Sequence, residues 1–310
     1  MIISASRRTD IPAFYPEWIA NRLKAGEVLV RNPMRETQVA RIALDPKLIE
    51  CIVFWTKNPE PMLKYLDDIT GMGYMYYFTY TLNYYGKEIE PHLPDVADRI
   101  KTFIELSNKI GKKRVIWRYD PIVFTPDYSP EWHIKCFDTL ARILGPHTEK
   151  AVVSFVDIYP GKNYAKLNPL GMYEADYGTK LEVMKAFAEI AHRENIGIAT
   201  CAENMDELRK FGIEKNSCID ARLIERLIGE QIMDEPEKQR SACGCARSVD
   251  IGRYDTCPHG CAYCYANIDM KKTKDIMSAY DPASPLLCGA VDPERDQVYN
   301  RDIEPLIVPF

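Results

Sequence analysis

The sequence has 310 residues, of which 46% are hydrophobic, and carries a formal net charge of −5 at pH 7. A chain of this length and apolar content buries a sizeable core, which excludes a mainly disordered protein, and its acidic balance argues against a general polyanion-binding surface. No apolar run approaches the roughly 20 residues that span a bilayer, and the arginines follow the short apolar start instead of preceding it, so we expect a cytoplasmic protein without membrane contact.

Short β-type runs alternate with helical patterns through the first two-thirds of the chain. Strands are expected at 1–6, 51–57, 74–82, 114–119, 151–158 and 196–202. Helices are expected at 16–25, 59–69, 95–110, 130–144, 179–194 and 203–211, and Ser129 is expected to be the N-cap of the fourth of them. Repeated βαβ units imply a parallel sheet. The sequence therefore predicts an α/β fold arranged as a partial or closed (β/α) TIM-type barrel, with a doubly wound open sheet as the competing arrangement.

The alternation ends after residue 212, where the distribution of the ten cysteines becomes important. Cys243, Cys245, Cys257, Cys261 and Cys264 lie close together, and in a reducing compartment such a group indicates metal binding more than disulfides. We expect a barrel body at 1–212, a cysteine-rich cluster-binding segment at 213–275 that completes the barrel and holds a short helix at 220–229, and a coil tail at 276–310.

Polar side chains gather just after the expected strands, where the active sites of α/β barrels lie. They include Arg7, Arg8, Thr9, Asp10, Thr56, Lys57, Asn58, Asn83, Arg118, Asp120, Asp157, Cys201 and Glu203. Arg7, Arg8 and Lys57 form the most basic part of this expected mouth. They indicate an anionic substrate, such as a phosphate or a nucleic acid fragment, unless these charges are simply solvated or cap helices.

The central motif is a run with the spacing C-x3-C-x2-C, which reads Cys257-Pro258-His259-Gly260-Cys261-Ala262-Tyr263-Cys264. Soft thiolates select iron–sulfur clusters, zinc or copper(I). A closed structural zinc site takes four ligands, whereas three cysteines around a [4Fe–4S] cluster leave one iron open to another ligand. The spacing favours an iron–sulfur cluster, with zinc as the alternative.

This motif resembles the cluster loop of radical S-adenosylmethionine (SAM) enzymes, and the run CPHGCAYCYAN is similar to that of the spore photoproduct lyase-like branch. The resemblance implies that Cys257, Cys261 and Cys264 hold a [4Fe–4S] cluster whose fourth iron binds the amino and carboxylate groups of SAM. It further implies that one electron, from a reductant such as a ferredoxin or flavodoxin, cleaves SAM to a 5′-deoxyadenosyl radical. Tyr263 would then contact the adenine.

The motif stands near the C-terminus, whereas this superfamily usually carries it after the first strand. Segments that resemble the rest of that branch precede it, namely SRRTDIPAFYP, IVFWTKNPEPMLKYL, LNYYGKEIEP and VIWRYDPI. A circularly permuted radical SAM-like barrel accounts for both observations, with a last strand at about Ser248 to Gly252 closing beside the first. The whole chain is also similar to an uncharacterised bacterial domain-of-unknown-function family with a radical-SAM-like C-terminal cysteine cluster.

Candidate SAM-binding residues follow from the charges of the cofactor. A carboxylate is bound best by a guanidinium or by backbone N–H groups, which makes Arg118, near Asp120, the candidate. Asp10 and Glu203 are candidates for the SAM ammonium or the ribose hydroxyls. The alternative for Arg118 and Asp120 is a structural ion pair at the barrel rim.

A second group of cysteines, Cys201, Cys218, Cys243 and Cys245, is a candidate for an auxiliary [4Fe–4S] cluster, because four thiolates are the usual complement. Cys288 is a substitute ligand. The alternative is that isolated cysteines are small buried hydrophobes, which is the interpretation we favour for Cys51 and Cys136.

Three functions stay open at this point. The first is a radical SAM-like iron–sulfur enzyme acting on an unknown small-molecule or anionic substrate. The second is a non-catalytic iron–sulfur electron carrier or redox sensor that does not bind SAM. The third, suggested only by analogy with the photoproduct lyase branch, is a nucleic-acid-binding or repair factor.

Overall fold

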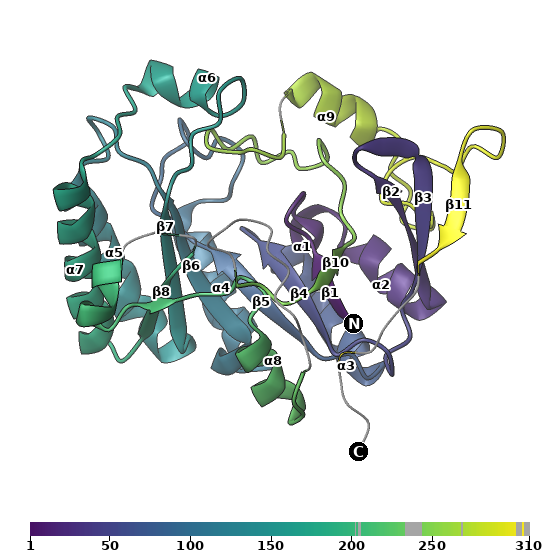
Figure 1. The fold of residues 1–310 in the computed structure, drawn as a ribbon, viewed down its shortest axis with the longest axis horizontal. Coiled ribbons are helices and arrows are strands. Elements are labelled where there is room, and N and C mark those ends of the chain that lie inside the picture. The colour runs from purple at the N-terminus through teal and green to yellow at the C-terminus, as the bar shows by residue number, and fades with distance from the viewer. Residues whose placement is uncertain (202, 204–205, 233–243, 268, 302–305, 307–310) are drawn as a thin grey trace.

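The structure is a computed structural model that describes residues 1–201, 203, 206–232, 244–267, 269–301 and 306 (Figure 1). Its main sheet has eight strands in the order β10-β1-β4-β5-β6-β7-β8-β9, and each neighbouring pair is parallel. The bounds are β1 (Ile2–Ala5), β4 (Cys51–Thr56), β5 (Tyr76–Thr81), β6 (Val115–Ile122), β7 (Lys150–Phe155), β8 (Gly197–Thr200), β9 (Glu214–Lys215) and β10 (Ser248–Asp250).

The strand order separates the two arrangements that the sequence leaves open. A doubly wound sheet reverses its order at a switch point. Here the order runs in one direction from β1 to β9, as it does in a barrel wound from strand to strand. Among the described residues β9 and β10 are the edges of the sheet and do not pair with each other, so the fold is an open, barrel-like one.

β10 runs beside β1, although these strands come from opposite ends of the sequence (Figure 1). Residues 2–4 pair in parallel register with residues 248–250, which confirms the expected strand beside the first. The Asp250 carboxylate reinforces the pairing, because it accepts hydrogen bonds from Ser4 Oγ at 2.9 Å and Ser6 Oγ at 2.7 Å. The pairing carries the cysteine motif to the carboxyl edge of the sheet.

Helices cover the sheet unequally. Those of the described residues are α1 (Ile11–Phe14), α2 (Pro16–Ala25), α3 (Leu66–Gly71), α4 (Val96–Ile110), α5 (Pro130–Leu144), α6 (Tyr164–Leu167), α7 (Tyr177–Arg193), α8 (Ala221–Ile228) and α9 (Met270–Met277). Residues of α2, α4, α5 and α7 belong to one hydrophobic cluster, whereas α8 contributes to another. In this part of the chain, none of the helices combines the length and the apolar character that crossing a bilayer requires.

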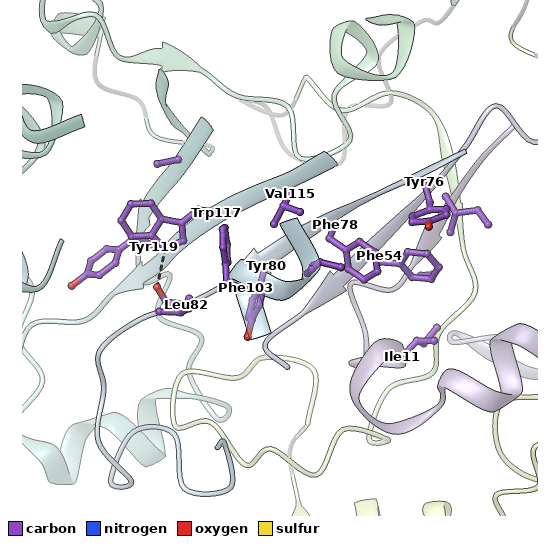
Figure 2. Packing of buried hydrophobic residues seen from close by; sticks show 14 of the residues in the cluster. Ile11, Phe54, Tyr76, Phe78, Tyr80, Leu82, Phe103, Val115, Trp117 and Tyr119 are labelled. Atoms are coloured by element: carbon purple, nitrogen blue, oxygen red, sulfur yellow. Dashed lines mark hydrogen bonds between the residues drawn. The ribbon is translucent and has the colours of Figure 1, made fainter. Parts of the chain in front are cut away.

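The two clusters lie on opposite faces of the sheet, because successive side chains of a strand point to opposite faces. Phe54, Phe78 and Trp117 belong to the main core with residues of α4 and α5, and Phe54 and Phe78 stack with ring centroids 4.9 Å apart (Figure 2). Val53 and Ile116 belong to the other face, with α8. Burial on both faces explains why these strands read as continuous apolar runs.

Two predicted helices differ from expectation. The segment 59–69 begins as a 3₁₀ helix at Glu60–Tyr65 and continues as α3. In the segment 203–211, residues Asp206–Phe211 form a 3₁₀ helix, and residues 204–205 lie outside the described part. The other described 3₁₀ helices are Lys112–Arg114, Gly145–His147 and Asn168–Leu170.

A three-stranded sheet was not expected from the sequence. It has the order β11-β3-β2, with β2 (Glu27–Asn32), β3 (Arg35–Ala43) and β11 (Gln297–Asn300). β11 corrects the expectation of a purely coil tail at 276–310. All its residues are exposed and its pairing with β3 is long-range, so local periodicity carries no signal for it. The tail also contacts α2, where Trp18 Nε1 donates to Ser284 O at 2.9 Å.

Candidate functional site

A cavity of about 620 Å³ lies at the carboxyl ends of the main-sheet strands. Its lining includes four strand residues, Trp55, Thr81, Arg118 and Ser154. They lie on the same face of the sheet as the strand residues that pack against α8. The sequence-predicted site residues that line it are Asp10, Arg118, Asp120, Cys201, Glu203, Cys218, Cys245, Cys257, Cys261, Tyr263 and Cys264. Of the other candidate cysteine ligands, Cys243 lies outside the described residues and Cys288 does not line the cavity.

The C-x3-C-x2-C loop follows β10 and folds over this cavity. Backbone hydrogen bonds fasten it to the segment after β5, from Ala262 N to Ile89 O at 2.8 Å and from His92 N to His259 O at 3.3 Å. Gly260 has a φ of +72°, and an added Cβ would lie 3.1 Å from both Pro91 and His92. The motif therefore requires glycine at this position for both backbone conformation and space.

The three thiols of the loop influence one another. Burial raises the pKa of Cys257 well above its usual value, and the nearby Asp10, Cys264 and Cys261 raise it further. Burial also raises the pKa of Cys261 to about 12. Without a metal these two thiols therefore keep their protons at neutral pH, and a metal must displace the protons to bind.

A network of charged side chains around Glu90 holds the loop through Tyr263. Glu90, which is 1% exposed, accepts hydrogen bonds from Arg99 Nη1 at 3.0 Å, from Lys57 Nζ at 3.3 Å and from the Tyr263 hydroxyl. Burial raises the pKa of Glu90, but Lys57 and Arg99 outweigh it and leave the pKa below its usual value. Lys57 Nζ also lies 4.9 Å from the centroid of the Tyr263 ring. Glu90 therefore holds the hydroxyl of Tyr263, and Lys57 contacts its ring.

Asp10 connects the loop to the segment after β1. Its carboxylate accepts hydrogen bonds from Ala13 N at 3.1 Å, as the N-cap of α1, and from Lys57 N at 2.8 Å. His259 Nε2 lies 2.9 Å from Asp10 Oδ2. Both carboxylate oxygens thus have protein partners. Among the described groups, the buried His259 Nδ1 has no hydrogen-bond partner.

Arg118 and Asp120 form the ion pair that the sequence left as an alternative to SAM binding. Arg118 Nε donates to Asp120 Oδ2 at 3.0 Å, and Arg118 Nη1 donates to Cys218 Sγ at 3.3 Å. Burial lowers the pKa of Arg118, but Asp120 more than compensates, so the pKa is raised. Asn83 fixes the backbone of Asp120 through reciprocal hydrogen bonds of 3.1 Å.

Glu203 reaches the cavity from beyond β8. Its Oε1 accepts a hydrogen bond from Phe155 N at 2.8 Å. Burial raises its pKa, and Asp157 raises it further. The group therefore retains a proton to higher pH than an exposed glutamate does.

The second cysteine group also converges. Cys201 at the end of β8 and Cys218 before α8 have their Sγ atoms 2.7 Å apart. This contact and a hydrogen bond to Cys245 lower the pKa of Cys218, whereas the same contact raises the pKa of Cys201. Cys288 is buried beside Tyr15, and Cys51 belongs to the α8 cluster.

The basic residues of the mouth are partly engaged. Arg7 N donates to Asp250 Oδ2 at 2.8 Å, and the Nε atoms of Arg7 and Arg8 lie 3.7 Å and 3.8 Å from the same carboxylate. Arg7, Arg8 and Lys57 all line the cavity. An anionic substrate stays a prediction.

Sequence reasoning missed Glu90 and Asp250 as individual residues. Glu90 stands in a segment singled out only for its resemblance to another family, and no local pattern marks a glutamate that two distant cations will bury. Asp250 stands in the expected last strand, but its role depends on pairing with β1. Both contacts are long-range, so spacing along the chain cannot reveal them.

Gly252 offers a test of how the loop is joined to β1. A Cβ at Gly252 would overlap the Ser6 hydroxyl, which cannot move away because it donates to Asp250 and accepts from Arg8 N at 2.9 Å. We expect Gly252→Ala to lower the free energy of unfolding by about 1–3 kcal/mol in urea titration. Gly71→Ala is the control, because its Cβ would meet nothing within 4 Å. Equal stability of the two variants would contradict the close packing of Gly252 against Ser6.

The placement of the candidate ligands distinguishes a single metal ion from an iron–sulfur cluster. In the part of the chain that the structure describes, no three His, Cys, Asp or Glu groups are placed to hold a single metal ion. A [4Fe–4S] cluster binds its cysteines through different irons and so needs sulfurs further apart than one ion does. Three soft thiols on one loop beside a cavity fit that group.

Comparison with other proteins gives a family and no activity. No curated protein matches the chain. A family described as a domain of unknown function, DUF1848, matches residues 2–266, and the chain therefore belongs to this family.

Proposed function

We propose that the protein is a radical SAM-like iron–sulfur enzyme in which Cys257, Cys261 and Cys264 hold a [4Fe–4S] cluster and the adjoining cavity holds SAM and substrate. The observation that carries this proposal is the position of the three-cysteine loop over a cavity at the carboxyl edge of a parallel, barrel-like sheet. Such a cluster, when bound, supplies the electron that starts radical chemistry. The cavity volume of about 620 Å³ is typical of sites for small molecules.

The chain's own residues prepare this site. Glu90 and Lys57 fix the Tyr263 ring beside the cysteines, which suits a side chain that positions a flat group such as adenine. Asp10 and His259 hold the loop against the first strand. Arg118 is directed to Asp120 and Cys218, which favours a structural role for this pair over binding of the SAM carboxylate.

The test uses protein purified without oxygen and then reduced. We expect about four irons and four sulfides from the loop, and an electron paramagnetic resonance spectrum that changes when SAM is added. Cys261→Ala should abolish the SAM-responsive signal, because a cluster lacking one thiolate is lost. Cys136→Ala, on α5, is the matched control and should keep the signal.

The contrary outcomes are specific. Iron whose spectrum ignores SAM would favour the electron carrier or redox sensor and overturn the enzyme. Zinc in place of iron would make the loop a structural metal site.

A further inference from the structure

Three other cysteines meet on the wall of the same cavity. Cys201, Cys218 and Cys245 come from three separate segments, namely the end of β8, the stretch before α8 and the stretch before β10. Cys201 Sγ and Cys218 Sγ are 2.7 Å apart, closer than ordinary non-bonded contact. A hydrogen bond joins Cys218 to Cys245. All three sulfurs are therefore one group.

Packing alone does not account for this group. Cysteines that act as small hydrophobes are expected inside a core, as Cys51 is in the α8 cluster. Cys245 belongs to the same cluster, and Cys201 and Cys218 pack against it, but unlike Cys51 all three also line the cavity, at the boundary between the α8 cluster and the polar cavity wall. A disulfide between Cys201 and Cys218 would use only two of the three sulfurs.

Hydrogen-bond donors already point at the sulfurs. Arg118 Nη1 donates to Cys218 Sγ at 3.3 Å, and Ile219 N donates to Cys245 Sγ at 3.4 Å. N–H groups directed at sulfur are the outer contacts that stabilise metal-bound thiolates and tune iron–sulfur clusters. Asp120 holds Arg118 in place, and Asn83 and Ser154 in turn hold Asp120.

We propose that Cys201, Cys218 and Cys245 form a second iron–sulfur site, separate from the Cys257 loop and bordering the same cavity. Soft thiolates select iron–sulfur clusters over magnesium or calcium. Rotation of the side chains must separate Cys201 from Cys218 when the cluster binds. Because both cysteine groups border one cavity, a substrate bound there lies within reach of both sites.

The experiment separates the two sites by counting iron in anaerobically purified protein. The unchanged chain should hold about eight irons, the C257A/C261A/C264A variant about four, and the same variant with Cys218→Ala almost none. Cys245→Ser tests the site without a large change in side-chain size, and Cys136→Ala is the control. Circular dichroism checks that each variant is folded.

The iron counts distinguish failure of the second site from failure of the loop cluster on which the proposed function rests. If the unchanged chain holds about four irons and C257A/C261A/C264A holds none, the second site is refuted and the loop cluster stands. If C257A/C261A/C264A keeps all the iron, the loop assignment falls and the second site stands. Zinc in that variant, or a Cys201–Cys218 disulfide detected by thiol titration of the anaerobically purified protein before any reduction, would overturn the second cluster.

Discussion

Glu90→Gln is expected to lower the free energy of unfolding by about 3–5 kcal/mol at neutral pH, because it leaves the buried Arg99 and the partly buried Lys57 without their counter-charge. Arg99 is 2% exposed, and its Nη1 lies 3.0 Å from Glu90 Oε2. Lys57 is the second cation, at 3.3 Å. The amide keeps the size of the side chain, so the loss reports charge and not a cavity. Urea denaturation measures it.

The effect should depend on pH in one direction. The pKa of Glu90 is lower in the folded protein than its usual value of 4.5, so ionised Glu90 favours folding. This contribution is complete above the unfolded pKa and is lost as the pH falls through the folded pKa. The stability difference between the unchanged protein and Glu90→Gln should therefore shrink in acid.

An exposed glutamate on the neighbouring helix serves as the control. Glu105 on α4 is exposed, and Glu105→Gln should change stability by no more than about 0.5 kcal/mol. A stability difference for Glu90→Gln that is small, or that stays constant between neutral pH and acid, would contradict the buried network. Since Glu90 also holds the Tyr263 hydroxyl, the variant tests whether the cysteine loop depends on this network.

Much of the fold follows from local patterns. The helix predicted at 16–25 is α2 (Pro16–Ala25), and Ser129 caps α5 by accepting from Trp132 N at 3.3 Å. The parallel sheet follows from the alternation of patterns, and here the signal is a period or a cap that is readable along the chain. The position of β10 beside β1 is expected only from the resemblance to a circularly permuted barrel.

Long-range pairing limits what the sequence can reveal. β11 pairs with β3 across most of the chain, and no periodicity in its four exposed residues indicates a strand. The same limit applies to the site. Cysteine spacing identifies the loop, but the convergence of Cys201, Cys218 and Cys245, and the use of Asp10 to hold His259, depend on which strands lie side by side.

Trp117→Ala is expected to destabilise the protein by about 3–5 kcal/mol, with little direct change to the cavity. Trp117 is completely buried, stacks on Phe137 with ring centroids 4.8 Å apart, and donates from Nε1 to Leu82 O at 3.0 Å (Figure 2). Alanine would leave a void in the main core and an unpaired carbonyl. Urea denaturation measures the loss.

Trp55→Ala removes a ring of the same size from the opposite face of the sheet. Trp55 is half-buried and lines the cavity, where Arg118 lies 5.4 Å from the ring centroid. Solvent can fill the space that its ring leaves, so the expected stability loss is smaller than for Trp117→Ala. The change should instead weaken small-molecule binding in the cavity. Equal stability losses for the two variants would contradict the division of this sheet into a core face and a cavity face.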